Sequence, residues 1–367
     1  MNVLLSAAIS LDGCLDDTSS RRLILSPAED LAEIDRLRAA SDAILVGART
    51  LRCDNPSLRV RSAALVEERK AAGRAPQPLK VTVTTRGELP SDLRFFEGDR
   101  PPVVFAAAPL PPQLAQRAET ICAPEITAAL IVTELEKRGV ENLLVEGGGE
   151  ILSMFLRENM ADRLRLATAP FIVGEAGAPR FLRPGRYPFD SGHRAVTESL
   201  RMAGDMSVAT YRFHDDDPVR DRECLARAVE LSRRCTPDPE CYRVGAVVVT
   251  ASGARYEGYT QMTARKNHAE EEAVAAALQA GADLRGATVY SSVEPCSARS
   301  SKPESCSRLL LRLGVRKVVF GLYEPDRFVH CTGALDLRRA GVRTLYLPEF
   351  ARQILDINAH LFSRPRH

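Results

Sequence analysis

The sequence predicts a two-domain α/β protein, and three observations predict it. Strand-like apolar segments alternate with amphipathic helical segments through both halves of the chain. The chain has 367 residues, whereas a single domain usually has roughly 100–200. The acidic segment His214–Pro218, which ends in proline, follows a strand-like segment and separates the halves. We therefore expect a first domain at residues 1–214 and a second at residues 219–367.

The first half predicts a layered α/β domain. It begins with the strand-like segment Val3–Ile9, after which Ser26 and Pro27 begin a helix, with Ser26 as the N-cap and Pro27 in the first turn. Leu31 and Leu37 lie on the apolar face of this helix. Further strands are predicted at Asp42–Val46, Lys80–Thr84, Val103–Ala107, Asn142–Val145, Leu164–Val173 and Ser207–Phe213, and a helix at Ile151–Leu156.

The second half predicts another α/β sandwich of ordinary domain size. Its helices are expected at Arg222–Arg234, from His268 to about Ala280 and from about Glu304 to Leu313. Its strands are expected at Val244–Val249, Arg255–Gly258, Ala287–Ser291, Lys317–Phe320 and Thr344–Leu347.

Composition narrows the class of function. The 50 Lys and Arg nearly balance the 48 Asp and Glu, and aromatic residues make up 5% without any Trp, which argues against a nucleic-acid partner. Apolar runs fall short of the roughly 20 residues of a membrane span. The N-terminal segment has no basic region typical of a signal peptide. We therefore expect a cytoplasmic protein without a membrane partner, whose nine Cys are reduced thiols or metal ligands.

The strongest motif is His268-Ala-Glu270, followed by Pro295-Cys296 and later Cys306. One imidazole and two thiolates are three ligands for Zn²⁺, and they leave a fourth tetrahedral position for water. Zinc lowers the pKa of such a water toward about 7. Glu270 would then carry protons from the water to a ring nitrogen and to departing ammonia. The pattern matches the signature of zinc deaminases, except that nine residues separate the two Cys.

Two further expectations concern this motif. Pro295 and Cys296 would begin a helix, whose positive end favours a thiolate. A closed structural zinc site is the rival interpretation, with His330 or Cys331 as the fourth ligand, but such a site gives Glu270 no role.

In the first half, residues alone indicate less. The Gly-rich turn Glu146–Gly149 lies between a strand and a helix, where backbone N–H groups suit a pyrophosphate, although a simple tight turn explains it equally well. A polar loop at Ala48–Pro56 follows another strand. Arg38 and Arg61 are each able to hold a phosphate, or are ordinary surface charges.

Both halves resemble a known family, the bifunctional riboflavin-biosynthesis deaminase/reductases. Residues 1–213 resemble the reductase domain, and residues 220–348 look like the zinc deaminase domain, whose family also has a wide gap between its Cys ligands. The stretches that carry the first likeness are Ser10–Gly13, Leu37–Ala39, Asp42–Gly47, Thr50 with Asp54–Arg61, Leu144–Gly148 and Ala169–Gly174. The resemblance implies a dihydrofolate-reductase-like fold followed by a cytidine-deaminase-like α/β/α sandwich.

The resemblance also implies a substrate and site residues. The family deaminates a diaminopyrimidinone ribosylamino 5′-phosphate and uses NADPH to reduce its ribose to a ribityl chain, and its members usually form homo-oligomers. By position, the NADPH residues are Ala8, Thr50, Asp54, Thr85, Gly148, Gly149, Glu150, Ile151, Leu152 and Ser153. The substrate residues of the reductase are Ser20, Arg38, Leu58, Arg61 and Glu146.

Three departures from the family pattern leave alternatives open. The usual bacterial chain has its deaminase first. Where the family has Asn in a Pro-Asn-Pro stretch, this chain has Asp238 followed by an insertion, and the loop at Glu324–Gly333 also differs. An ionised carboxylate accepts hydrogen bonds but does not donate them. The identity of the ring that the deaminase acts on is therefore left open. The alternatives are a modified pyrimidine or purine, a reductase with a non-catalytic zinc module, and a nucleic-acid deaminase.

Overall fold

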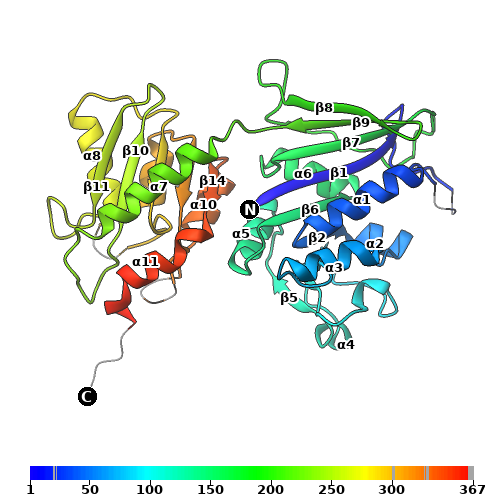
Figure 1. Ribbon diagram of the computed structural model, residues 1–367, viewed down its shortest axis with the longest axis horizontal. Helices are drawn as coiled ribbons and strands as arrows, with labels where there is room; N and C mark the ends of the chain where they lie inside the picture. The colour runs from blue at the N-terminus through cyan, green and yellow to red at the C-terminus, as the bar shows by residue number, and fades with distance from the viewer. Residues whose placement is uncertain (20, 22, 300–301, 326, 328–329, 363–367) are drawn as a thin grey trace. The chain divides into compact units, whose positions relative to one another are not determined.

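The chain forms two compact units in the computed structural model (Figure 1). The structure describes residues 1–19, 21, 23–299, 302–325, 327 and 330–362, and the predicted substrate residue Ser20 lies outside them. The first unit is Met1–Asp215 and the second begins at Asp216, so the division falls within the acidic segment His214–Pro218. None of the described helices combines the length and the apolarity needed to cross a membrane.

The first unit is built on a nine-stranded sheet in the order β5-β4-β3-β2-β6-β1-β7-β9-β8. Its elements are β1 (Asn2–Ser10), α1 (Ala28–Ala40), β2 (Ala43–Gly47), α2 (Ala48–Asp54), α3 (Ala63–Ala71), β3 (Leu79–Thr84), η1 (Arg94–Phe96), β4 (Val103–Ala106), α4 (Pro112–Ala115), β5 (Glu119–Cys122), α5 (Ala128–Lys137), β6 (Asn142–Gly147), α6 (Gly149–Arg157), β7 (Arg163–Ala169), β8 (Val196–Ala203) and β9 (Met206–Arg212).

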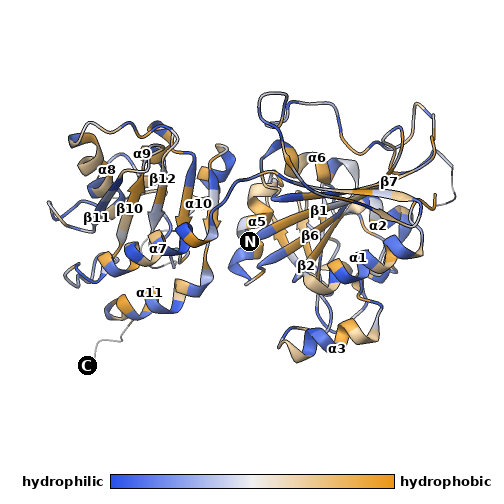
Figure 2. Cartoon of the chain, turned by 45° about the horizontal axis from the view of Figure 1, so that its top comes forward, coloured by the Kyte–Doolittle hydropathy of each residue, from blue (hydrophilic) through white to orange (hydrophobic). Residues whose placement is uncertain are grey.

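The strand directions place the ends of the central strands together. All neighbours from β5 to β7 pair in parallel, while β9 and β8 complete the sheet by antiparallel pairing. Strands β1, β2 and β6 are mostly hydrophobic, as buried parallel strands are (Figure 2). The carboxyl ends of β1, β2, β3 and β6 therefore meet at one edge of the sheet, where open α/β sheets bind ligands.

Helix α1 differs from its prediction in two ways. Its N-cap is Pro27, which makes no side-chain cap, so the prediction of Ser26 as N-cap is wrong. Leu31 is 43% exposed. The buried polar residue of the helix is Asp30, which forms an ion pair with the buried Arg165 of β7. A specific ion pair, rather than the apolar stripe alone, ties α1 to the sheet. Strand β7 ends at Ala169, earlier than the predicted Val173.

The second unit is built on a five-stranded sheet in the order β11-β10-β12-β13-β14, in which β12, β13 and β14 are parallel. Its elements are α7 (Pro218–Ser232), β10 (Gly245–Val249), β11 (Arg255–Tyr259), α8 (Ala269–Gln279), β12 (Thr288–Ser291), α9 (Cys306–Arg312), β13 (Lys317–Phe320), α10 (Gly333–Arg339), β14 (Arg343–Tyr346), η2 (Pro348–Phe350), α11 (Ala351–Ile357) and η3 (Ala359–Leu361).

Alternating side chains of this sheet bury two separate cores. Val248 and Val318 pack in one core with residues of α8, α9 and α10. Their neighbours Val247 and Val319 pack in the other core with residues of α7. Because successive strand residues point to opposite faces, helices cover both faces of the sheet. The predicted α/β/α sandwich is therefore confirmed for this unit.

Candidate active sites

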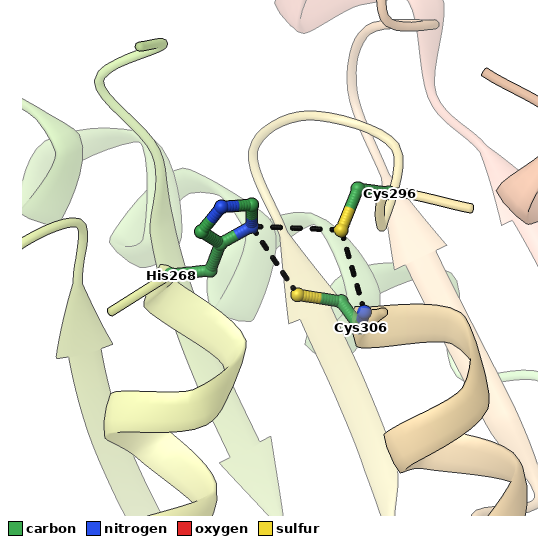
Figure 3. Close-up of side chains that lie close together, drawn as sticks. All are labelled: His268, Cys296 and Cys306. Atoms are coloured by element: carbon green, nitrogen blue, oxygen red, sulfur yellow. Dashed lines mark hydrogen bonds between the residues drawn. The ribbon is translucent and has the colours of Figure 1, made fainter. Parts of the chain in front are cut away.

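The three predicted zinc ligands lie together in the second unit (Figure 3). His268 is the N-cap residue of α8, Cys306 is the first residue of α9, and Cys296 lies in the segment after β12. Their ligand atoms all lie within 4.8 Å of one another. His268 Nδ1 is 3.5 Å from the Sγ atoms of both Cys296 and Cys306. Residues far apart in the sequence thus present one nitrogen and two sulfurs to one point.

The helix predicted to begin at Pro295 and Cys296 is absent from the described residues, so that prediction is wrong. These residues have no regular structure, and the next helix, α9, begins at Cys306 with Ser305 as its N-cap. The positive end of a helix nevertheless lies next to the Cys296 sulfur, as expected. The backbone N–H of Cys306, at the positive end of α9, donates to Cys296 Sγ at 3.3 Å. A helix N-terminus therefore favours the Cys296 thiolate, but it belongs to a different helix from the predicted one.

The donor set fits a zinc ion. The hydrogen bond with Cys306 and the neighbouring His268 lower the pKa of Cys296, whereas the same hydrogen bond and burial raise the pKa of Cys306. An imidazole nitrogen and two sulfurs are ligand types that Zn²⁺ takes in proteins. Among the described residues the group of ligand atoms holds His268, Cys296 and Cys306 alone. Neither His330 nor Cys331 joins it, so the geometry does not support the closed structural site.

Glu270 is buried beside this group. It is 3% exposed, and its carboxylate accepts a hydrogen bond from Ser291 Oγ at 2.9 Å and lies 3.4 Å from Cys306 Sγ. Burial raises the pKa of Glu270 above its ordinary value. A carboxyl group with a raised pKa gives up and regains a proton near neutral pH more readily than an exposed one. The position suits the proton-carrying role predicted for it.

Glu271 also belongs to the site, although the motif analysis did not single it out. Its carboxylate accepts from the backbone N–H of His268 at 2.9 Å and pairs with both Arg299 and Lys302. Burial raises the pKa of Glu271, but the hydrogen bonds from Arg299, His268 and Lys302 outweigh it and lower that pKa to about 2. The only sequence signal for Glu271 is the run of three Glu after Ala269. Acidic residues are common in the first turn of a helix, so this run does not single out Glu271.

The two segments that depart from the family pattern each make defined contacts. The carboxylate of Asp238 accepts from the side chain of Gln261 at 3.2 Å and from the N–H of Glu240 at 2.9 Å, and these bonds lower its pKa. Glu324 is largely surrounded by protein, and this burial, with the nearby Cys296 thiol, raises its pKa to about 7. Both positions therefore carry carboxyl groups with altered protonation behaviour.

A cavity of about 1380 Å³ opens in the first unit. It lies at the carboxyl ends of β1, β2, β3 and β6, and most of the predicted cofactor residues line it: Ala8, Thr50, Asp54, Thr85, Gly148, Gly149, Glu150 and Ile151. Two of the predicted substrate residues, Arg61 and Glu146, line it as well. The volume suits a ligand larger than an ordinary small molecule.

Four predicted residues lie elsewhere. Leu152 and Ser153 are fully buried on the inner face of α6, and Ser153 Oγ accepts from the N–H of Arg183 at 2.8 Å. Leu58 is buried in the hydrophobic core. Arg38 does not line the cavity and instead binds both carboxylate oxygens of Glu146 at 2.6 Å. Position in a motif therefore did not fix the direction of these four side chains.

The Gly-rich turn shapes one wall of the cavity. Gly147 and Gly148 have positive φ angles of 131° and 79°, which favour glycine. Gly149, the first residue of α6, packs so closely that a Cβ atom there would lie 2.2 Å from the carbonyl oxygen of Arg180. The turn therefore requires glycine for both conformation and space.

Comparison with known proteins assigns each unit to a family. The model of the RibD C-terminal domain matches residues 1–197, and that of the cytidine and deoxycytidylate deaminase zinc-binding region matches residues 218–322. A 2,5-diamino-6-ribosylamino-4(3H)-pyrimidinone 5′-phosphate reductase of Archaeoglobus fulgidus is 33% identical over 183 residues, 48% of this chain and 84% of that protein. A diaminohydroxyphosphoribosylamino-pyrimidine deaminase of Schizosaccharomyces pombe is 35% identical over 127 residues, 34% of this chain and 31% of that protein.

A solved structure shares the fold of part of the chain. The RibD protein of Acinetobacter baumannii superposes with a TM-score of 0.50 at 21% identity, over 57% of each chain. The reductase-type unit precedes the deaminase-type unit here, although the matching family model is that of a C-terminal domain. The chain therefore belongs to the RibD C-terminal domain family, as a riboflavin-biosynthesis enzyme with a dihydrofolate-reductase-like reductase domain followed by a cytidine-deaminase-like zinc domain.

Proposed function

We propose that the chain deaminates a diaminopyrimidinone ribosylamino 5′-phosphate and reduces its ribose to a ribityl chain with NADPH. The observation that carries the proposal is the convergence of His268, Cys296 and Cys306 beside the buried Glu270. The names of the relatives supply the substrate class, which is that of the A. fulgidus and S. pombe proteins. A cytoplasmic location and assembly of identical chains stay predictions.

In the deaminase unit, His268, Cys296 and Cys306 would hold Zn²⁺, which supplies an activated water at neutral pH when bound. Glu270 takes a proton from the attacking water and delivers it to the ring nitrogen next to the amino-bearing carbon. A new carbon–oxygen bond forms at that carbon, the carbon–nitrogen bond breaks, and a second proton passes through Glu270 to the departing ammonia. Ser291 holds the Glu270 carboxylate at 2.9 Å during this exchange.

In the reductase unit, the cavity at the carboxyl ends of the strands would hold NADPH, which supplies a hydride when bound. The turn at Gly148 and Gly149 faces the cavity with backbone N–H groups suited to a pyrophosphate. Arg61 lines the cavity and would donate hydrogen bonds to the sugar phosphate. Arg38 holds Glu146 toward the cavity through two hydrogen bonds, so we propose that Arg38 acts through Glu146 rather than on the phosphate.

Product masses test the proposal directly. Purified enzyme is incubated with the diaminopyrimidinone ribotide and NADPH, and the products are identified by mass spectrometry. Deamination replaces NH by O and adds about one mass unit, and transfer of a hydride and a proton adds about two. Failure to release ammonia from any pyrimidine ribotide by zinc-loaded enzyme would favour a non-catalytic zinc module. Release from a modified base alone would favour the specialised substrate that Asp238 suggests.

Asp54→Ala tests the reductase site separately. Asp54 lines the cavity at the end of α2, and its loss should reduce NADPH oxidation by about tenfold or more while ammonia release stays unchanged. The two rates are measured on the same preparation, by absorbance of NADPH and by an ammonia assay. An unchanged rate of NADPH oxidation would show that this loop does not serve the reductase reaction.

A further inference from the structure

The loop between the two Cys ligands is tied to the helix that bears the third ligand. Residues 297–305 join Cys296 to Cys306, and this loop carries Arg299 and Lys302. Arg299 donates two hydrogen bonds to the carboxylate of Glu271, from Nη1 to Oε2 at 2.7 Å and from Nη2 to Oε1 at 2.9 Å. Lys302 Nζ donates to Oε1 of Glu271 at 3.0 Å. We call these three residues the Glu271 clamp.

The same carboxylate reaches the backbone of a ligand. Glu271 lies in the first turn of α8, and its Oε2 accepts from the N–H of His268 at 2.9 Å. Lys302 adds a second link, because its Nζ also donates to the side chain of Asn267, the residue before His268, at 2.5 Å. The clamp therefore joins the chain around His268 to the loop that positions both Cys residues.

The Arg299–Glu271 pair of the clamp is mostly buried, whereas Lys302 is 38% exposed. The side chain of Arg299 is 5% exposed and that of Glu271 is 19% exposed. A paired carboxylate and guanidinium at this depth hold a defined geometry, whereas an exposed pair gains little. Removing either partner breaks this geometry and leaves the remaining charge with fewer partners. In Glu271→Gln the Arg299 guanidinium loses its carboxylate, and in Arg299→Gln the Glu271 carboxylate keeps only Lys302 and the N–H of His268. We expect the loop to shift in response, and this shift would change the spacing between the two sulfurs and the imidazole.

We propose that Glu271 is a positioning residue for the metal site, which holds the inter-cysteine loop against the start of α8 so that the three ligands keep their spacing. Glu271 itself offers no atom to the group of ligand atoms. Its effect is on the affinity for zinc and, through this, on the reaction. The inference rests on the zinc site of the proposed function.

Zinc affinity of the full-length protein tests the clamp. The affinity is measured by competition with a chromophoric chelator, first for the wild type and then for Glu271→Gln and Arg299→Gln. Partners of metal ligands typically contribute about 10–100-fold to metal affinity, and we expect a loss in that range for each variant. The double variant should lose less than the product of the two single losses, because both substitutions break one pair.

Glu304→Gln is the matched control. Glu304 lies in the same loop and binds Arg312 by two hydrogen bonds of 2.8 Å, but its side chain is 41% exposed. We expect its zinc affinity within twofold of the wild type. Affinities within twofold for Glu271→Gln or Arg299→Gln, or fully multiplicative losses in the double variant, would overturn the clamp and leave the zinc site standing. A wild type without zinc affinity would overturn both.

Discussion

Glu270→Gln should abolish ammonia release and leave the rest of the protein working. Glutamine has nearly the same shape and keeps an oxygen that accepts from Ser291, as the carboxylate does at 2.9 Å. It does not carry a proton between water, ring nitrogen and leaving group. General acid–base catalysis contributes about 10²–10⁴-fold, so the rate of deamination should fall by that factor. Zinc content and NADPH oxidation should stay at the wild-type level.

Three measurements on one preparation separate the possible causes. Ammonia release, zinc content by atomic absorption and NADPH oxidation are compared with the wild type and with Glu304→Gln, the same substitution at an exposed site of the unit. A loss of zinc together with ammonia release would mean that Glu270 supports the metal site rather than the proton transfers. Undiminished ammonia release would remove Glu270 from the mechanism.

That the three candidate zinc ligands would lie together could be expected from the sequence, because each lies near the end of an element with a clear signal. His268 is the N-cap of α8, Ser305 is the N-cap of the helix that Cys306 begins, and Cys296 lies in the segment after strand β12. Such local signals fix the ends of elements, and the sandwich fold brings these ends together. Pro295 was misleading because it precedes an irregular segment here, although proline also favours the first turn of a helix.

The Glu271 clamp could not be predicted, because it depends on contacts across 28 and 31 residues of sequence. Three consecutive Glu at a helix start all fit the helix dipole, so residue type does not separate Glu270, the proposed proton carrier, from Glu271, the proposed clamp residue. Only the direction of each side chain does. The same reason explains Arg38, whose type suits a phosphate but whose position in α1 directs it onto Glu146.

In the first unit, the family resemblance supplied the predicted cofactor residues, and the parallel strand order explains why most of them line one cavity. Ala8, Thr85 and Gly148 come from three different strand ends, and all three line it. The position of residues in the motif did not predict which side chains of α6 face the cavity. Ile151 lines the cavity while Leu152 and Ser153 point into the core, as expected when successive residues turn by about 100°.

Gly149→Ala should disable the reductase while sparing the deaminase. The added Cβ would lie 2.2 Å from the carbonyl oxygen of Arg180 and 3.3 Å from that of Phe181. Backbone cannot yield there as a flexible side chain can, so either the start of α6 or the segment at Arg180 must move. Overpacking of this kind lowers the free energy of unfolding by about 1–3 kcal/mol. A domain of ordinary stability, about 5–15 kcal/mol, stays folded after such a loss.

The movement falls on the cavity itself. Gly148, Gly149, Arg180 and Arg183 all line it, and the N–H of Arg183 is bound to Ser153 of α6, so the displaced segment and the helix are coupled. We expect affinity for NADPH, measured by quenching or transfer of its fluorescence, to fall at least about tenfold, since losing 1.4 kcal/mol of binding free energy has that effect. Gly192→Ala is the control, because its Cβ would meet only Asp190 at 3.4 Å. If Gly149→Ala binds NADPH within twofold of the wild-type affinity, the nicotinamide cofactor does not bind at this turn. A cofactor bound there would lose contacts when the backbone moves.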